Sequence, residues 1–84
     1  MKIRVIRLSI FRESESDWEF NFDKPIRIQD IRIALHNELK QNQDQQLLSV
    51  LARSAFAREG NILVDDDLLI EDTELSVLPP VGGG

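Results

Sequence analysis

Hydrophobic and polar residues alternate in two short segments near the start of the chain. Residues 2–11 carry aliphatic side chains with polar residues interleaved, at Ile3, Val5, Ile6, Leu8 and Ile10. Trp18, Phe20 and Phe22 then recur at every second position. Because side chains of a strand point alternately to its two faces, both segments are predicted to be strands. The polar residues 13–17 would join them into a hairpin whose aromatic face points inward.

A helical repeat follows over residues 28–41. A helix would gather four apolar residues of this segment into one stripe, namely Ile28, Ile31, Leu35 and Leu39. Arg27 stands where a capping Ser, Thr, Asp or Asn would be expected, so the sequence leaves the start of the helix undefined. A shorter helix is predicted over residues 44–53, from the apolar positions Leu47, Leu48, Val50 and Leu51.

The remaining segments are predicted to be short strands separated by turns. Residues 54–58 and 62–64 would flank the turn Glu59-Gly60-Asn61, in which Gly and Asn supply the bend. An acidic loop over residues 65–72 leads to a last strand over 74–78. In that strand Leu75 and Val77 would face one side of the sheet, and Glu74, Ser76 and Leu78 the other.

Together these elements predict an α+β fold, with one main helix lying across one face of a mixed sheet of about four to five strands. The last strand is expected beside the first, because a short domain must fix its terminus within the sheet. This is the β-grasp, or ubiquitin-like, architecture, predicted for residues 1–78, with residues 79–84 as a flexible tail. The architecture alone does not indicate a function.

Composition narrows the classes of function. The 84 residues contain no cysteine and a single histidine, His36, which leaves no set of soft ligands for a metal. Asp65-Asp66-Asp67 lacks the spacing of a calcium-binding loop, so a solvated acidic loop is expected. No segment has the length of a membrane helix or the apolar stretch of a signal peptide, so we expect a cytoplasmic protein that does not enter membranes.

The charge distribution favours a basic partner over nucleic acid. The formal net charge is −5, and residues 41–84 hold two basic and eight acidic residues, a net charge of −6. A protein of this charge is poorly suited to bind a phosphate backbone. Its acidic half would instead suit a protein partner with a basic surface.

The last six residues, Pro79-Pro80-Val81-Gly82-Gly83-Gly84, carry the clearest functional signal. The two prolines end the strand and stiffen the segment, whereas the three glycines have no side chains. Fully extended, six residues reach about 20 Å. Such a tail could thread a narrow channel and deliver its terminal carboxylate to a buried site in another protein. A disordered end without function is the alternative interpretation.

With this tail, the chain resembles the small subunit of molybdopterin synthase, a family of ubiquitin-like sulfur carriers that end in a strand followed by Pro-Pro-Val-x-Gly-Gly. The similarity continues upstream in residues 71–78, 56–62, 29–31 and 11–13. Gly82 replaces the Ser, Ala or Thr usual in that family, and a triple-glycine end is more similar to the related thiamin sulfur carrier. The proline pair and the chain length favour the molybdopterin family.

The resemblance implies that the carboxylate of Gly84 is the reacting group. In the family, an adenylyltransferase similar to ubiquitin-activating enzymes uses ATP to join this carboxylate to AMP, and a sulfur donor protein converts it to a thiocarboxylate. The sulfur then passes to a pterin precursor in the large subunit of molybdopterin synthase. The chain would be a non-catalytic carrier that binds no cofactor itself. The segment entering the partner's active site would be Pro79, Pro80, Val81, Gly82 and Gly83.

The resemblance also implies docking positions at Leu78, Ile62 and Leu8. Leu78 faces away from the inward pair Leu75 and Val77, so an apolar patch bordered by acids would lie at the base of the tail. This arrangement suits an interface with an apolar centre and a polar rim. All three residues could instead belong to the core.

Three other functions stay open beside this one. A thiamin-type carrier would use the same chemistry in another pathway. A protein modifier would join the activated Gly84 to lysine side chains of its targets. A non-covalent adaptor would bind its partner whether or not the tail is present.

Overall fold

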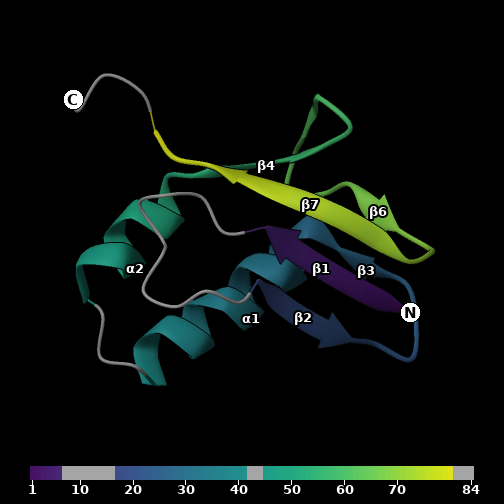
Figure 1. The fold of residues 1–84 in the computed structure, drawn as a ribbon, viewed down its shortest axis with the longest axis horizontal. Helices are drawn as coiled ribbons and strands as arrows, with labels where there is room; N and C mark the ends of the chain where they lie inside the picture. Colours follow the sequence, from purple (N-terminus) through teal and green to yellow (C-terminus); the bar gives the residue numbers. More distant parts are fainter. Residues whose placement is uncertain (7–16, 42–44, 81–84) are drawn as a thin grey trace.

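In the part of the chain that the structure describes, residues 1–6, 17–41 and 45–80, five strands form a mixed sheet and two helices lie on one side of it (Figure 1). The structure is a computed structural model. In chain order the elements are β1 (Lys2–Ile6), β2 (Trp18–Asn21), β3 (Ile26–Arg27), α1 (Ile28–Gln41), α2 (Gln45–Ala52), β4 (Ala55–Arg58), β5 (Asn61–Leu63), β6 (Leu68–Leu69) and β7 (Thr73–Leu78).

The strands of the main sheet have the order β2-β1-β7-β4-β5. β1 and β7 run parallel, from the pair Ile3 and Thr73 to the pair Ile6 and Ser76, and the other neighbouring strands are antiparallel. The last strand therefore lies beside the first at the centre of the sheet, as predicted. With α1 across one face, this confirms the β-grasp fold.

The apolar stripe predicted for the long helix forms the centre of the core. All four of its residues are buried, and they pack with residues on the inner face of the sheet, namely Ile3, Val5, Phe56, Leu75 and Val77. Trp18 is buried in the same cluster, and Phe20 and Phe22 pack partly against it, so the inward aromatic face is confirmed. Burying one large apolar side chain of this kind contributes about 1.5–3 kcal/mol.

The start of α1 is capped by one contact within its first turn and by two contacts from a distant part of the chain. The Asp30 carboxylate accepts a hydrogen bond of 2.9 Å from the backbone N–H of Arg27, as the third helical residue does in a capping box. The N–H groups of Ile28 and Gln29 donate to the carbonyl oxygens of Asp67 and Asp65, at 3.0 and 3.1 Å. These bonds satisfy donors at the end of the helix that have no partner within it.

The acidic segment is more regular than predicted. β6 lies within it and pairs with β3, through Ile26 with Leu69 and Arg27 with Leu68, so the prediction of a loop over 65–72 was wrong at these two leucines. The Asp67 carboxylate accepts a hydrogen bond of 2.8 Å from the N–H of Val64, which closes the turn before β6. The segment therefore has a structural role in addition to its charge.

Arg32 joins several parts of the fold through one guanidinium group. Its Nη1 donates to the carbonyl oxygens of Leu51 and Ser54, both at 2.8 Å, and its Nη2 donates to the Asp65 carboxylate at 2.8 Å. The guanidinium carbon lies 5.0 Å from the centre of the Phe56 ring, within the range of a cation–π contact. The planar, multidentate shape of arginine makes this set of contacts possible.

Replacing this side chain should destabilise the fold. We expect Arg32→Gln to lower the free energy of unfolding by about 2–3 kcal/mol, because it removes charge-assisted hydrogen bonds to two carbonyl groups and to the Asp65 carboxylate. Lys40→Gln, on the exposed end of the same helix, makes the same charge change and should stay within about 0.5 kcal/mol of the parent chain. Urea denaturation measures both, and equal effects of the two changes would contradict this role.

The turn between β4 and β5 is centred on Glu59 and Gly60, one residue earlier than the predicted Gly-Asn pair. Both residues have positive φ, 50° and 82°, and Asn61 already pairs with Arg58 in the ladder. A two-residue loop with positive φ at both positions is typical of a type I′ hairpin.

Glu59 holds a left-handed conformation that glutamate seldom adopts. Asparagine tolerates this region better, so Glu59→Asn should raise the free energy of unfolding by about 0.5–1 kcal/mol. Thermal denaturation at constant pH measures the difference. A lower melting temperature for the variant would show that the glutamate side chain stabilises the turn.

Candidate functional site

β7 holds the base of the predicted tail at the centre of the sheet. β1 pairs with its residues Thr73–Ser76 on one side, and β4 pairs with Ser76–Leu78 on the other. β7 ends at Leu78, and the half-buried Pro79 and Pro80 follow outside the strand. The start of β7 is therefore held by β1, and its end at Leu78 is held by the ladder with β4.

The other predicted tail residues, Val81, Gly82, Gly83 and Gly84, lie outside the described residues, and so does the predicted docking residue Leu8. The remaining docking residues can be placed. Leu78 is 36% exposed and faces away from the helices, whereas Leu75 and Val77 are buried beneath the sheet. The predicted orientation of Leu78 is thus confirmed.

Leu78 and Ile62 lie on one face of the sheet, on either side of two alanines. Leu78 pairs with Ala55 across β4 and β7, and Ile62 pairs with Ala57 across β4 and β5. Since Ala55 and Ala57 are two residues apart, they share the face opposite the core. The spacing of strands and residues puts the Cα atoms of Leu78 and Ile62 roughly 12 Å apart. We call Ala55, Ala57, Ile62 and Leu78 the apolar platform.

The apolar platform has the shape of a docking surface. Ile62 is 66% exposed, so its side chain projects from the sheet, whereas the alanines between it and Leu78 form a low floor in which Ala55 is half-buried and Ala57 is only 7% exposed. A partner backbone or side chain can approach such a floor closely, and exposed apolar groups of this size commonly mark contact surfaces. The platform lies at the base of the tail, so a partner bound there would be close to the residues that follow Pro80.

Sequence reasoning identified the two large residues of the platform and missed its alanines. The signal was present in Ala55-Phe56-Ala57, where a large apolar residue lies between two small ones on a short strand. Phe56 is buried and the alanines lie on the opposite face, as the alternation of a strand requires.

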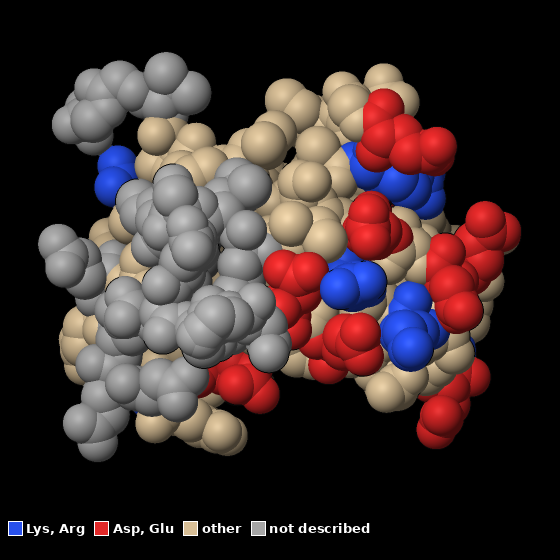
Figure 2. All heavy atoms as spheres, in the orientation of Figure 1, with Lys and Arg blue, Asp and Glu red and all other residues tan. Residues whose placement is uncertain are grey.

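Charged side chains of both signs lie on the same molecule. Figure 2 shows acidic and basic groups interspersed over the half of this view that contains β3, β6 and the start of β7. The visible described residues therefore do not form the continuous basic surface typical of proteins that bind nucleic acid.

The described side chains form no recognisable catalytic or metal centre. No three His, Cys, Asp or Glu side chains within residues 1–6, 17–41 and 45–80 are placed to hold a metal ion. His36 is exposed on α1. Neither helix in the described part of the chain combines the length and the apolar character needed to cross a membrane. The features with functional chemistry are therefore the apolar platform and the segment that begins at Pro79.

Comparison with known proteins finds a relative of the chain. No protein-family model matches the chain. The chain is 33% identical over 63 residues to the molybdopterin synthase sulfur carrier subunit of Synechococcus elongatus. The aligned region covers 74% of this chain and 70% of that protein.

Proposed function

The chain belongs to the family of molybdopterin synthase sulfur carrier subunits, and from this premise we propose that it carries sulfur on its C-terminal carboxylate as the small subunit of a molybdopterin synthase. The observation that carries the proposal is the end of β7. A strand held first by β1 and then by β4 leads directly into Pro79-Pro80, and the sequence continues with Val81 and three glycines. A fixed base followed by a thin segment suits delivery of the terminal group to another protein.

The chemistry begins with activation of a poor acyl donor. The Gly84 carboxylate attacks the α-phosphate of ATP on an adenylating enzyme, pyrophosphate leaves, and an acyl adenylate forms. Sulfide supplied by a donor protein then attacks the acyl carbon and displaces AMP, so a C–S bond replaces the C–O bond to AMP and the terminus becomes a thiocarboxylate. This chain contributes reach and access, because the glycines before the terminus present no side chain to the walls of a channel.

The large subunit of the synthase is the proposed acceptor of the carried sulfur. The apolar platform would dock on that subunit while the tail enters its active site, where the thiocarboxylate sulfur would attack the pterin precursor. Water would then cleave the acyl C–S bond, which leaves the sulfur on the pterin and a free carboxylate on Gly84. Since the adenylating enzyme must receive the same tail, the two partners would bind one after the other. Pro79 and Pro80 would limit the directions in which the tail leaves the sheet.

A thiamin-type sulfur carrier is the second candidate function. The observation that favours it is Gly82, which gives the sequence a triple-glycine end. The two functions share the loading steps and differ in the protein that accepts the sulfur, so the acceptor distinguishes them.

Intact-mass measurement tests the proposal. The chain is incubated with ATP, a ubiquitin-activating-like adenylyltransferase from a molybdopterin pathway and a sulfur donor. We expect a product whose mass corresponds to replacement of one oxygen atom by sulfur, located by fragmentation on Gly84. An unchanged mass in a reaction that loads a known carrier would contradict the proposal, and higher-mass conjugates on lysines would identify a protein modifier instead.

A further inference from the structure

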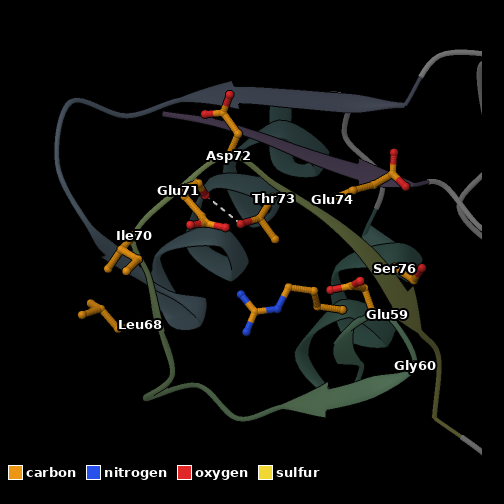
Figure 3. A pocket seen from close by; sticks show the side chains of 10 residues that line it. Glu59, Gly60, Leu68, Ile70, Glu71, Asp72, Thr73, Glu74 and Ser76 are labelled. Carbon is orange, nitrogen blue, oxygen red and sulfur yellow. Dashed lines mark hydrogen bonds between the residues drawn. The ribbon is translucent and has the colours of Figure 1, made fainter.

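A hollow of about 770 Å³ opens beside the start of β7, at the end of that strand away from the tail. Figure 3 shows how it is bordered: the turn residues Glu59 and Gly60 lie on one side, Leu68 and Ile70 on the other, and residues 71–74 lead into β7 between them. From Thr73 to Leu78 the strand rises about 17 Å, so the start of β7 and Leu78 lie at opposite ends of it. The hollow adjoins the apolar platform at Ser76, which lines the hollow and pairs with Ala57.

The hollow exists because β4 and β7 diverge. Their ladder runs from Leu78 to Ser76, whereas β1 follows β7 as far as Thr73. Within the described part of the chain, residues 73–75 therefore have a ladder on one side only. An edge of this kind can accept the main chain of an extended segment from another molecule.

Two large apolar side chains are held at the border of the hollow. Leu68 is 51% exposed and Ile70 is 69% exposed, but Leu69 between them is buried in the core and paired with Ile26. Because buried Leu69 anchors this segment, the side chains of Leu68 and Ile70 are held exposed to solvent. Such exposure is unfavourable unless a partner covers the side chains.

The charged residues that line the hollow are mostly acidic. The hollow is lined by four acidic residues and one basic residue, Arg58, so the formal charge of its lining is −3. The acidic residues are Glu59, Glu71, Asp72 and Glu74. The Asp72 carboxylate is positioned by a hydrogen bond of 2.7 Å from the backbone N–H of Lys2, and the Thr73 hydroxyl donates to the Glu71 carbonyl at 2.7 Å. The Asp72 carboxylate and the backbone at Glu71 are thus held in place before any partner binds.

We propose that this hollow is a second docking site, which binds an extended segment of a partner protein in which basic side chains alternate with apolar ones. The basic groups would face the carboxylates, the apolar groups would cover Leu68 and Ile70, and the main chain would lie along residues 73–75 of β7. A net negative lining disfavours phosphate groups. The inference does not depend on the sulfur chemistry, because it uses none of the tail residues.

Titration of the full chain, labelled with ¹⁵N, tests this docking site. The probe is an acetylated and amidated five-residue peptide in which lysine alternates with valine. We expect chemical-shift changes at the backbone amides of Glu59, Gly60 and residues 70–74, and weaker binding as salt is raised. The same peptide with glutamate in place of lysine should not bind.

Charge-matched variants distinguish binding at the hollow from non-specific electrostatic attraction to the whole chain. The triple variant Glu59→Gln, Glu71→Gln and Glu74→Gln should weaken lysine-peptide binding about tenfold, the combined effect of three exposed ion pairs. The control Asp23→Asn, Glu38→Gln and Asp66→Asn removes the same charge at exposed sites outside the hollow and should bind as the parent does.

The apolar half of the site has its own test. Ile70→Ser should weaken binding of the lysine peptide about threefold. Because the Ile70 side chain is exposed, the substitution should not change the amide spectrum outside the hollow. Three outcomes would each overturn the proposal: equal binding by both triple variants, shift changes centred on the apolar platform, or equal affinity for the glutamate peptide.

Discussion

Deletion of Gly84 should abolish formation of the thiocarboxylate and leave the stability of the fold unchanged. The shortened chain ends in the carboxylate of Gly83, about 3.5 Å short of the position that the adenylating site requires. Misplacement of a reacting group by even 1 Å can lower a rate about 100-fold, so we expect at least that loss of loading. The described core extends only to Val77, so the melting temperature should not change. Intact mass and thermal denaturation measure the two results.

The matched variant is Gly84→Ala, which keeps the length of the chain and its terminal carboxylate. It should load more slowly than the parent, because a methyl group is added where the channel must be narrow, but faster than the deletion. Loading of the Gly84 deletion at the parent rate would show that the terminal position is not the reacting group.

Introducing a charge on the apolar platform should have the second largest effect. We expect Ile62→Asp to weaken binding to the large subunit about 30-fold or more, the loss found when a central apolar contact of an interface is removed. Because Ile62 is exposed, the substitution should not unfold the chain. Leu78→Asp should act in the same direction. Isothermal titration with the purified large subunit measures both.

The chain contains a matched control for this substitution. Ile33 on α1 is 57% exposed and lies on the helical side of the sheet, away from the platform. Ile33→Asp makes the same chemical change and should leave the affinity for the large subunit unaltered. If it weakened binding as much as Ile62→Asp, the docking face would be assigned to the wrong side of the molecule.

The platform and the core share one strand, which explains why Arg32 matters to both. Phe56 lies between Ala55 and Ala57 in sequence and points to the opposite face, into the core. Arg32 lies over the ring of Phe56 and bonds to the residues just before β4. The guanidinium therefore supports the floor of the platform from below, and its loss should loosen the docking face as well as lower stability.

Elements with a strong repeat could be predicted from the sequence. The stripe from Ile28 to Leu39 predicted the helix over its full length, 28–41, because a period of three to four residues is maintained through about three turns. The alternation of Trp18, Phe20 and Phe22 gave a strand and its inward face. Each of these patterns lies within one element, and the burial of one face of that element is enough to produce the pattern.

Features that depend on distant contacts could not be predicted. Asp30 supplies a local part of the cap of α1, but the other part comes from carbonyl oxygens of Asp65 and Asp67, almost forty positions later in the chain. The partners of Arg32 lie on three other segments. β6 has two residues, too few for any period to appear, and its pairing with β3 decides that it is a strand.

The candidate site shows the same division. The outward direction of Leu78 followed from alternation along its strand, and Ile62 followed from the resemblance to the sulfur carriers. Predicting the alanine floor would require knowing the register of β4 with its neighbours β5 and β7. Predicting the hollow would require knowing where β4 and β7 separate, and the residue pattern of neither strand indicates that point.

Transfer of labelled sulfur tests the central claim most directly. The chain is loaded at its terminus with radioactive sulfur, purified, and mixed in excess with the large subunit and the pterin precursor. We predict that the label leaves the protein and appears in the pterin product, while the chain returns to the mass of the free acid. Label that stays on the chain, or a chain that becomes linked to lysines of the large subunit, would contradict the assignment as a sulfur carrier of molybdopterin synthase.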